Sequence, residues 1–161
     1  MRIGTMTRQR VLERSSEAVA GWPLLREATG YIGHVQIRNR GTVGGSLSHA
    51  FPSAELPVAM VTLDATFVLR GEDGERLVGA EDFFLGTMTT VLNPGELLRE
   101  VRVPAMVVRG GTSFQEVSRR YGDFAMAGAA ALVTLDRSGM VAGARLTLTG
   151  ATPLRAHAAE A

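Results

Sequence analysis

The stretch Ile37-Arg38-Asn39-Arg40-Gly41-Thr42-Val43-Gly44-Gly45-Ser46 marks the point where a helical pattern ends and a glycine-rich segment begins. Residues 41–52 follow neither the helical nor the strand period, so they are predicted to form a loop. Glycine tolerates positive φ, so the Gly44-Gly45 pair could point consecutive backbone N–H groups into one concavity. Such a nest binds an anion, most often a phosphate, and the hydroxyls of Thr42 and Ser46 would add donors. Spacing alone leaves a plain turn open as the alternative.

Helical spacing dominates the chain before this stretch, and period-two spacing dominates it afterwards. Helices are predicted over residues 8–22, from Pro23 to the Asn39-Arg40-Gly41 stop, and over residues 56–63. Residues 153–161 are predicted to begin a further helix. Strands are predicted at residues 2–6, 66–70, 75–78, 97–103, 112–119, 124–135 and 141–149. This order predicts the α+β fold class.

The composition excludes several classes of function. The chain has 161 residues, a net charge of +1 and no cysteine. A near-neutral chain has no field to attract nucleic acid or a membrane surface, and no apolar run is long enough to span a bilayer. Without cysteine there is no disulfide, thiolate metal site or iron–sulfur ligation by this chain. His49 has no second His or carboxylate at metal spacing, so we expect no metal site. The absence of cysteine fits a reducing compartment, so we expect a cytoplasmic protein.

Several segments resemble a known family. Residues 37–47, followed by Ser48-His49-Ala50-Phe51-Pro52-Ser53-Ala54-Glu55-Leu56, resemble the second FAD-binding signature in the flavin subunits of molybdenum hydroxylases. That family includes the medium subunits of carbon monoxide dehydrogenase and xanthine dehydrogenase relatives. Residues 2–15 resemble the family's first strand and helix of this region, and residues 118–125 resemble the segment that opens its C-terminal domain. Residues 93–98 lie between them in the expected order.

The resemblance implies a fold and a function. It implies part of an FAD-binding domain of the vanillyl-alcohol-oxidase/PCMH type over residues 1–104. Part of a small C-terminal domain, an antiparallel sheet plus helix, would occupy residues 112–161. Such a subunit passes electrons from an iron–sulfur small subunit through FAD to a terminal acceptor, while a molybdopterin-containing large subunit oxidises the substrate. The alternatives are a truncated assembly or interaction module that binds no FAD, or another FAD enzyme such as a reductase of cell-wall precursor synthesis.

The resemblance also implies the cofactor-binding residues. In relatives, the positions of Thr42, Val43, Gly44, Gly45 and Ser46 hold the FAD pyrophosphate, and Glu55 stands where an Asp usually contacts the cofactor. Leu98 would pack near the flavin, Phe124 would cover the ring face, and Gln115 replaces a frequent Lys. Ser46 replaces the usual Asn, and Phe51 stands where an Asp is common. No residue is expected to act as a catalytic acid, base or nucleophile.

Two further expectations concern charge and length. Arg38, Arg40, Arg119 and Arg120 could hold phosphate or a partner subunit, and solvated surface charge is the alternative for each. Relatives begin with another lobe that carries a first Gly-Gly-x-Ser phosphate loop, and residues 1–36, which precede the second signature here, contain no such motif. The 161 residues alone are therefore expected to bind FAD weakly or not at all.

Overall fold

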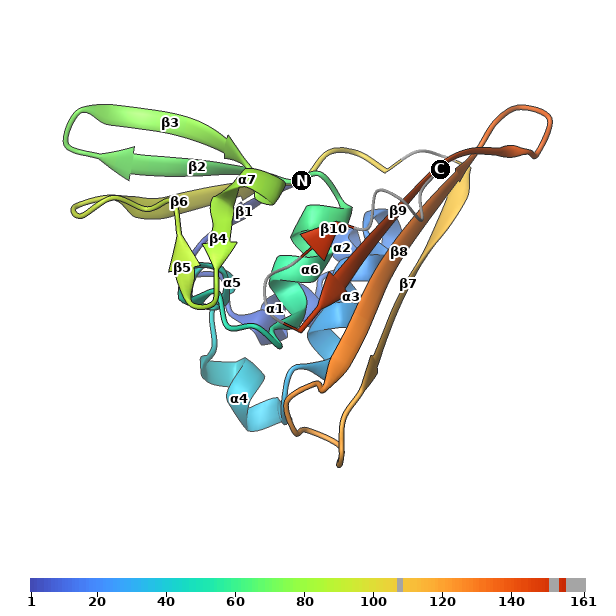
Figure 1. The fold of residues 1–161 in the computed structure, drawn as a ribbon, viewed down its shortest axis with the longest axis horizontal. Helices are drawn as coiled ribbons and strands as arrows, with labels where there is room; N and C mark the ends of the chain where they lie inside the picture. The colour runs from blue at the N-terminus through green and yellow to red at the C-terminus, as the bar shows by residue number, and fades with distance from the viewer. Residues whose placement is uncertain (107–108, 151–153, 156–161) are drawn as a thin grey trace.

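Two antiparallel sheets lie on either side of a group of helices (Figure 1). The computed structural model describes residues 1–106, 109–150 and 154–155. The first sheet has the strand order β1-β6-β2-β3 and the second the order β10-β9-β8-β7. Helices and antiparallel strands both contribute to one buried cluster, which confirms the predicted α+β class.

The first sheet is built by strands that are distant in sequence. β1 (Arg2–Gly4) and β2 (Thr66–Gly71) both pair with β6 (Leu97–Arg102), and β2 continues through a tight turn into β3 (Gly74–Gly79). This turn lies between the strands predicted at residues 66–70 and 75–78. A short helix and a two-stranded ribbon follow, namely α7 (Ala80–Phe83), β4 (Phe84–Gly86) and β5 (Thr89–Thr90).

The predicted helix over residues 8–22 is wrong in its continuity. It is two helices, α1 (Gln9–Arg14) and α2 (Ser16–Gly21), separated by Ser15 in an extended conformation. The Ser15 hydroxyl accepts a hydrogen bond from the backbone N–H of Ala18 at 3.1 Å. Serine is a preferred N-cap because its oxygen satisfies a free amide of the first turn, so a new helix begins here.

The next predicted helix is also divided, and the predicted loop contains a helix. Gly33 at φ 41° separates α3 (Pro23–Tyr31) from α4 (Val35–Arg40), because a left-handed residue cannot continue a right-handed helix. Residues 43–49, predicted as loop, form α5 (Val43–His49), so that prediction is wrong. The helix α6 (Glu55–Thr62) was predicted, and all of its residues are buried.

The second sheet packs on the helices. Its strands are β7 (Gly110–Val117), β8 (Ala127–Leu135), β9 (Val141–Thr149) and β10 (Leu154–Arg155). β7 contacts α3, whereas β8 and β9 contact α6. The helix predicted at residues 153–161 is wrong at Leu154 and Arg155, which pair with β9, and its remaining residues lie outside the described ones.

Candidate functional site

A cavity of about 670 Å³ lies among α4, α5, the start of α6 and the loop between β7 and β8. Figure 1 shows α4 and this loop at the lower end of the molecule. Apolar groups dominate the cavity wall, with hydroxyl groups and glycine backbone on the α5 side. Ligand sites are typically concave and apolar with a few placed polar groups, so this cavity is the leading candidate.

The structure brings part of the predicted site together around this cavity. The predicted residues that line it are Thr42, Gly45, Ser46, Glu55 and Phe124. The other predicted residues lie elsewhere. Val43 and Gly44 are buried in the first turn of α5, and Leu98 lies in the core beside β2. Gln115 is exposed on the face of β7 opposite to Phe114. A contact between these four and FAD remains a prediction.

The predicted nest of free amides is wrong. The backbone N–H groups of Val43 and Gly44 donate to the carbonyls of Thr7 and Thr5, at 2.9 and 2.8 Å. The N–H of Gly45 donates to Thr42 Oγ1 at 3.0 Å, and that of Ser46 to the Thr42 carbonyl at 3.1 Å. The protein itself therefore uses these amides. The motif begins a helix instead of a positive-φ turn, because the Thr42 hydroxyl acts as an N-cap.

The glycines of the motif allow close packing. A Cβ at Gly44 would lie only 3.0 Å from the Cα of Thr5, and a Cβ at Gly45 would lie 2.8 Å from Thr42 Oγ1. Gly44 therefore lets α5 approach the segment after β1. Because Gly45 lines the cavity, its missing side chain also leaves backbone exposed to a ligand there.

An aromatic wall closes one side of the cavity. The rings of His49 and Phe51 stack at 6.0 Å with an interplanar angle of 4°, and Phe51 lies 4.7 Å from Phe124. Phe124 is 72% exposed, so its ring is available to a ligand. Phe51 was not predicted as a wall residue, although an aromatic side chain at a position where the resembling family often has Asp was a signal for it. Such a wall suits a flat heteroaromatic ring.

Three charged side chains at or near the cavity, those of Glu55, Arg40 and Arg38, differ in burial and in their partners. Burial, and to a smaller extent the neighbouring Glu116 carboxylate, raise the pKa of Glu55 to about 7. Arg40 lines the cavity, and among the described residues no carboxylate forms an ion pair with it. Arg38 is 3% exposed and donates to Glu13 and to two backbone carbonyls, so its predicted phosphate role and its alternative as solvated charge are both wrong.

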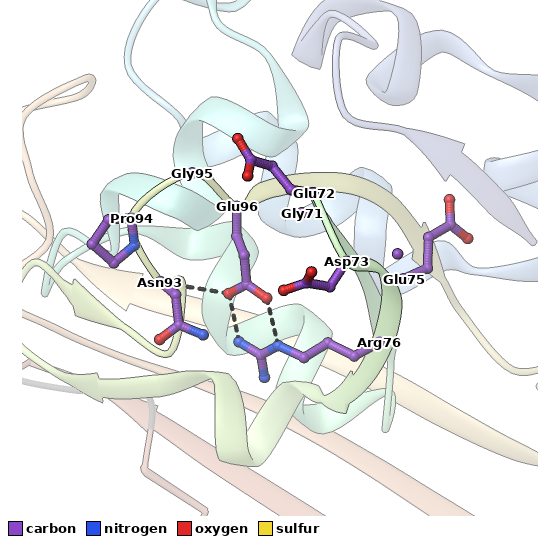
Figure 2. A pocket seen from close by; sticks show the side chains of 10 residues that line it. Gly71, Glu72, Asp73, Glu75, Arg76, Asn93, Pro94, Gly95 and Glu96 are labelled. Carbon is purple, nitrogen blue, oxygen red and sulfur yellow. Dashed lines mark hydrogen bonds and ion pairs between the residues drawn. The ribbon is translucent and has the colours of Figure 1, made fainter.

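A second hollow, of about 470 Å³, lies beside the β2–β3 turn (Figure 2). Arg76 donates to both carboxylate oxygens of Glu96 at 2.7 Å and to the Val91 carbonyl at 2.7 Å. Glu96 also accepts from the backbone N–H of Asn93 at 2.8 Å. With its arginine engaged and its other charged residues acidic, this hollow is a structural clamp rather than an anion site.

The described residues contain neither a cluster of metal-binding side chains nor a membrane-spanning helix. Within residues 1–106, 109–150 and 154–155, no group of three or more His, Asp or Glu side chains is placed to hold a metal ion. In the same part of the chain, no helix has the length and apolar character needed to cross a membrane.

Comparison with known proteins identifies the family. Residues 1–106 match the family model described as the FAD binding domain in molybdopterin dehydrogenase. The chain belongs to this family. It is 43% identical over 160 residues to the 6-hydroxypseudooxynicotine dehydrogenase complex subunit alpha of Paenarthrobacter nicotinovorans, covering 98% of this chain and 54% of that protein. It is 41% identical over 152 residues to the carbon monoxide dehydrogenase medium chain of Hydrogenophaga pseudoflava, covering 94% and 52%.

Solved structures of relatives share the fold. A structure of carbon monoxide dehydrogenase from Hydrogenophaga pseudoflava that lacks the Mo-pyranopterin moiety matches with a TM-score of 0.94 at 41% identity, covering 98% of this chain and 55% of that one. Quinoline 2-oxidoreductase from Pseudomonas putida 86 matches with a TM-score of 0.88 at 34% identity, covering 96% and 53%. The family resemblance stated from the sequence is confirmed. The chain spans about half the length of these relatives.

Proposed function

We propose that this chain forms part of the FAD site in the flavin subunit of a molybdenum hydroxylase. The subunit would receive electrons from an iron–sulfur small subunit and pass them to a terminal acceptor, beside a molybdopterin-containing large subunit in the cytoplasm. One observation carries the proposal. The signature positions Thr42, Gly45 and Ser46 line an apolar cavity, in a chain of the FAD-binding family with a TM-score of 0.94 to a carbon monoxide dehydrogenase.

The residues around the cavity fit a dinucleotide. Thr42 Oγ1 accepts from the N–H of Gly45, which leaves its own O–H proton to donate to a phosphate oxygen. Ser46 adds a second hydroxyl, and the Arg40 guanidinium supplies a positive charge at the same wall. Gly45 has no side chain to keep a bulky cofactor from the backbone. These groups replace the amide nest as the proposed binding elements for the diphosphate.

The aromatic wall and Glu55 would orient the cofactor and exclude water. FAD, when bound, supplies the electron exchange, and the protein's share is binding, orientation and electrostatics. Phe51 and Phe124, whose rings are tilted by 44° to one another, offer apolar ring faces to the ring system. With a pKa of about 7, the Glu55 carboxyl holds its proton in a large share of molecules near neutral pH. A protonated Glu55 donates a hydrogen bond to the cofactor instead of repelling its phosphates.

Titration with FAD tests this function. The purified chain is titrated to millimolar FAD while quenching of flavin fluorescence is followed. We expect weak, saturable, one-to-one binding that Phe124→Ala weakens, whereas Val141→Ala, an exposed apolar residue on β9 away from the cavity, leaves it unchanged. Absence of saturable binding overturns the proposal. Capture of an iron–sulfur partner without any flavin would then favour the assembly-module alternative.

A further inference from the structure

The wall of the cavity holds a buried glutamine that the proposed function has not used. Gln9 begins α1, is only 5% exposed, and lines the cavity beside Gly41 and Thr42. Its backbone N–H donates to the carbonyl of Gly41 at 2.9 Å. The side chain therefore reaches the cavity wall from a backbone position that is held next to the signature segment.

The carboxamide oxygen of Gln9 lacks a hydrogen-bond partner within the described part of the chain. Its Oε1 atom is buried, and no donor among the described residues reaches it. Buried polar atoms without a hydrogen bond are uncommon in folded proteins, because the loss of water is not compensated. The terminal torsion of glutamine is broad and roughly two-fold, so the carboxamide can turn its oxygen toward the cavity while the rest of the side chain stays in place. A donor on a bound ligand would then satisfy it.

Gly41 makes room for this carboxamide. A Cβ at position 41 would lie 2.8 Å from Cδ and 3.2 Å from Nε2 of Gln9. The backbone at Gly41 has φ −61° and ψ 143°, a conformation that any residue can adopt. The Gln9 atom closest to that position is Oε1, so a side chain at position 41 would displace the carboxamide, and the two residues form one matched feature of the wall.

We infer that Gln9 is a cofactor-contacting residue whose carboxamide oxygen accepts a hydrogen bond from a hydroxyl or N–H group of the dinucleotide. This inference rests on the proposed function, since it requires FAD in the cavity. FAD carries such donors in both halves, namely the ribityl hydroxyls and flavin imide of the FMN half, and the ribose hydroxyls and adenine amine of the ADP half. One carboxamide oxygen would contact one of these halves.

The test replaces Gln9 with methionine, which keeps the length of the side chain and removes its hydrogen-bonding atoms. Gln36→Met, on exposed α4 surface outside the cavity lining, is the matched control. Dissociation constants are measured for FAD, FMN and ADP on the purified chain. Loss of one hydrogen bond predicts about fivefold to tenfold weaker binding of FAD by Gln9→Met. The same factor should appear for either FMN or ADP, and the control should match the wild type.

The unfolding temperature separates contact from structural support. Without FAD, Gln9→Met should unfold at or above the wild-type temperature, because an unsatisfied buried oxygen has been removed. Binding of FAD within twofold of the wild type overturns the inference. Equal losses for FMN and ADP, or a loss of affinity together with a lower unfolding temperature, overturn it as well. If the wild-type chain itself shows no saturable FAD binding, the proposed function has failed and the role of Gln9 falls with it.

Discussion

Gly44 donates its backbone N–H to the carbonyl of Thr5 at 2.8 Å, and no space for a side chain remains between the two residues. A Cβ on Gly44 would lie 3.0 Å from both Cα and Cγ2 of Thr5 and closer still to its Cβ. This contact joins the start of α5 to the segment that leaves β1. The glycine signature thus holds the wall of the cavity to the first sheet.

Gly44→Ala should destabilise the chain by about 1 to 3 kcal/mol, because the added methyl group forces backbone to move. Gly30→Ala is the control, since Gly30 lies in α3 with nothing within 4 Å of its ideal Cβ. That change should leave stability equal or raise it by up to about 1 kcal/mol through helix propensity. Urea denaturation of both variants checks the prediction, and equal stabilities would contradict it.

Arg38→Met should cost about 3 kcal/mol, because it removes every donor that the buried guanidinium supplies. The carbonyls of Ile32 and Gly33 would lose the guanidinium that donates to them at 2.8 and 3.1 Å, and Glu13 would keep only its ion pair with Arg10. Arg14→Met, on an exposed position of the same helix as Glu13, should stay within about 0.5 kcal/mol. Chemical denaturation measures the stability of both variants. If Arg38→Met lost less than about 1 kcal/mol of stability, the Arg38–Glu13 ion pair would contribute no more than an exposed one.

Alternating patterns predicted the sheets well, because period-two spacing reports directly on which face of a strand is buried. The hairpin between β2 and β3 and the strands β8 and β9 follow from such local signals. The positions at which helices are interrupted were harder to predict. Ser15 and Gly33 interrupt runs with continuous helical spacing, and whether a cap or a left-handed residue ends a helix depends on packing across the chain.

The sequence predicted part of the cavity lining but not the hydrogen bonds that hold the signature segment in place. The family resemblance named Thr42, Ser46 and Phe124, which the fold brings to one cavity. Local chemistry could not show that the amides of α5 are used by Thr5 and Thr7, because those partners lie far away in sequence. For the same reason, a glutamine in α1 gave no sign that it reaches the wall formed by Gly41.

The titration of Glu55 should make stability depend on pH. Its folded pKa is about 7 against an ordinary value of 4.5, so the folded chain keeps a proton that the unfolded chain has released between these values. Stability therefore falls as the pH rises through this window. The stability of Glu55→Gln relative to the wild type should therefore increase as the pH rises through this window, by up to about 3 kcal/mol at a pH above the folded pKa. Urea denaturation across this pH range tests the prediction. Glu72→Gln, at the exposed β2–β3 turn, is the control for the lost charge. A flat difference would refute the shift.

Glu96 should have the opposite effect at acid pH. Hydrogen bonds from Arg76 and from the backbone N–H of Asn93 lower its pKa to about 2 (Figure 2). Below pH 4.5, the ordinary pKa of a glutamate, Glu96 takes up a proton in the unfolded chain but stays ionised in the folded chain. The contribution of Glu96 to stability is therefore complete above pH 4.5 and is lost as the pH falls toward 2. Glu96→Gln should be less stable than the wild type at neutral pH and equal to it near pH 2, whereas Asp73→Asn in the same hollow should show no such convergence.

Thr42 caps α5, and its proposed second role is to bind the cofactor. One pair of variants tests both roles while it controls for the size of the side chain. Thr42→Val keeps the volume but removes the oxygen that accepts from the N–H of Gly45, whereas Thr42→Ser keeps that oxygen. Thr42→Val should lose about 1 kcal/mol of stability through the lost cap. It should also bind FAD more weakly than Thr42→Ser, because no hydroxyl proton remains for the diphosphate. Denaturation and FAD titration of the two variants measure both effects. Equal FAD affinities with unequal stabilities would confine Thr42 to its capping role and remove it from the cofactor site.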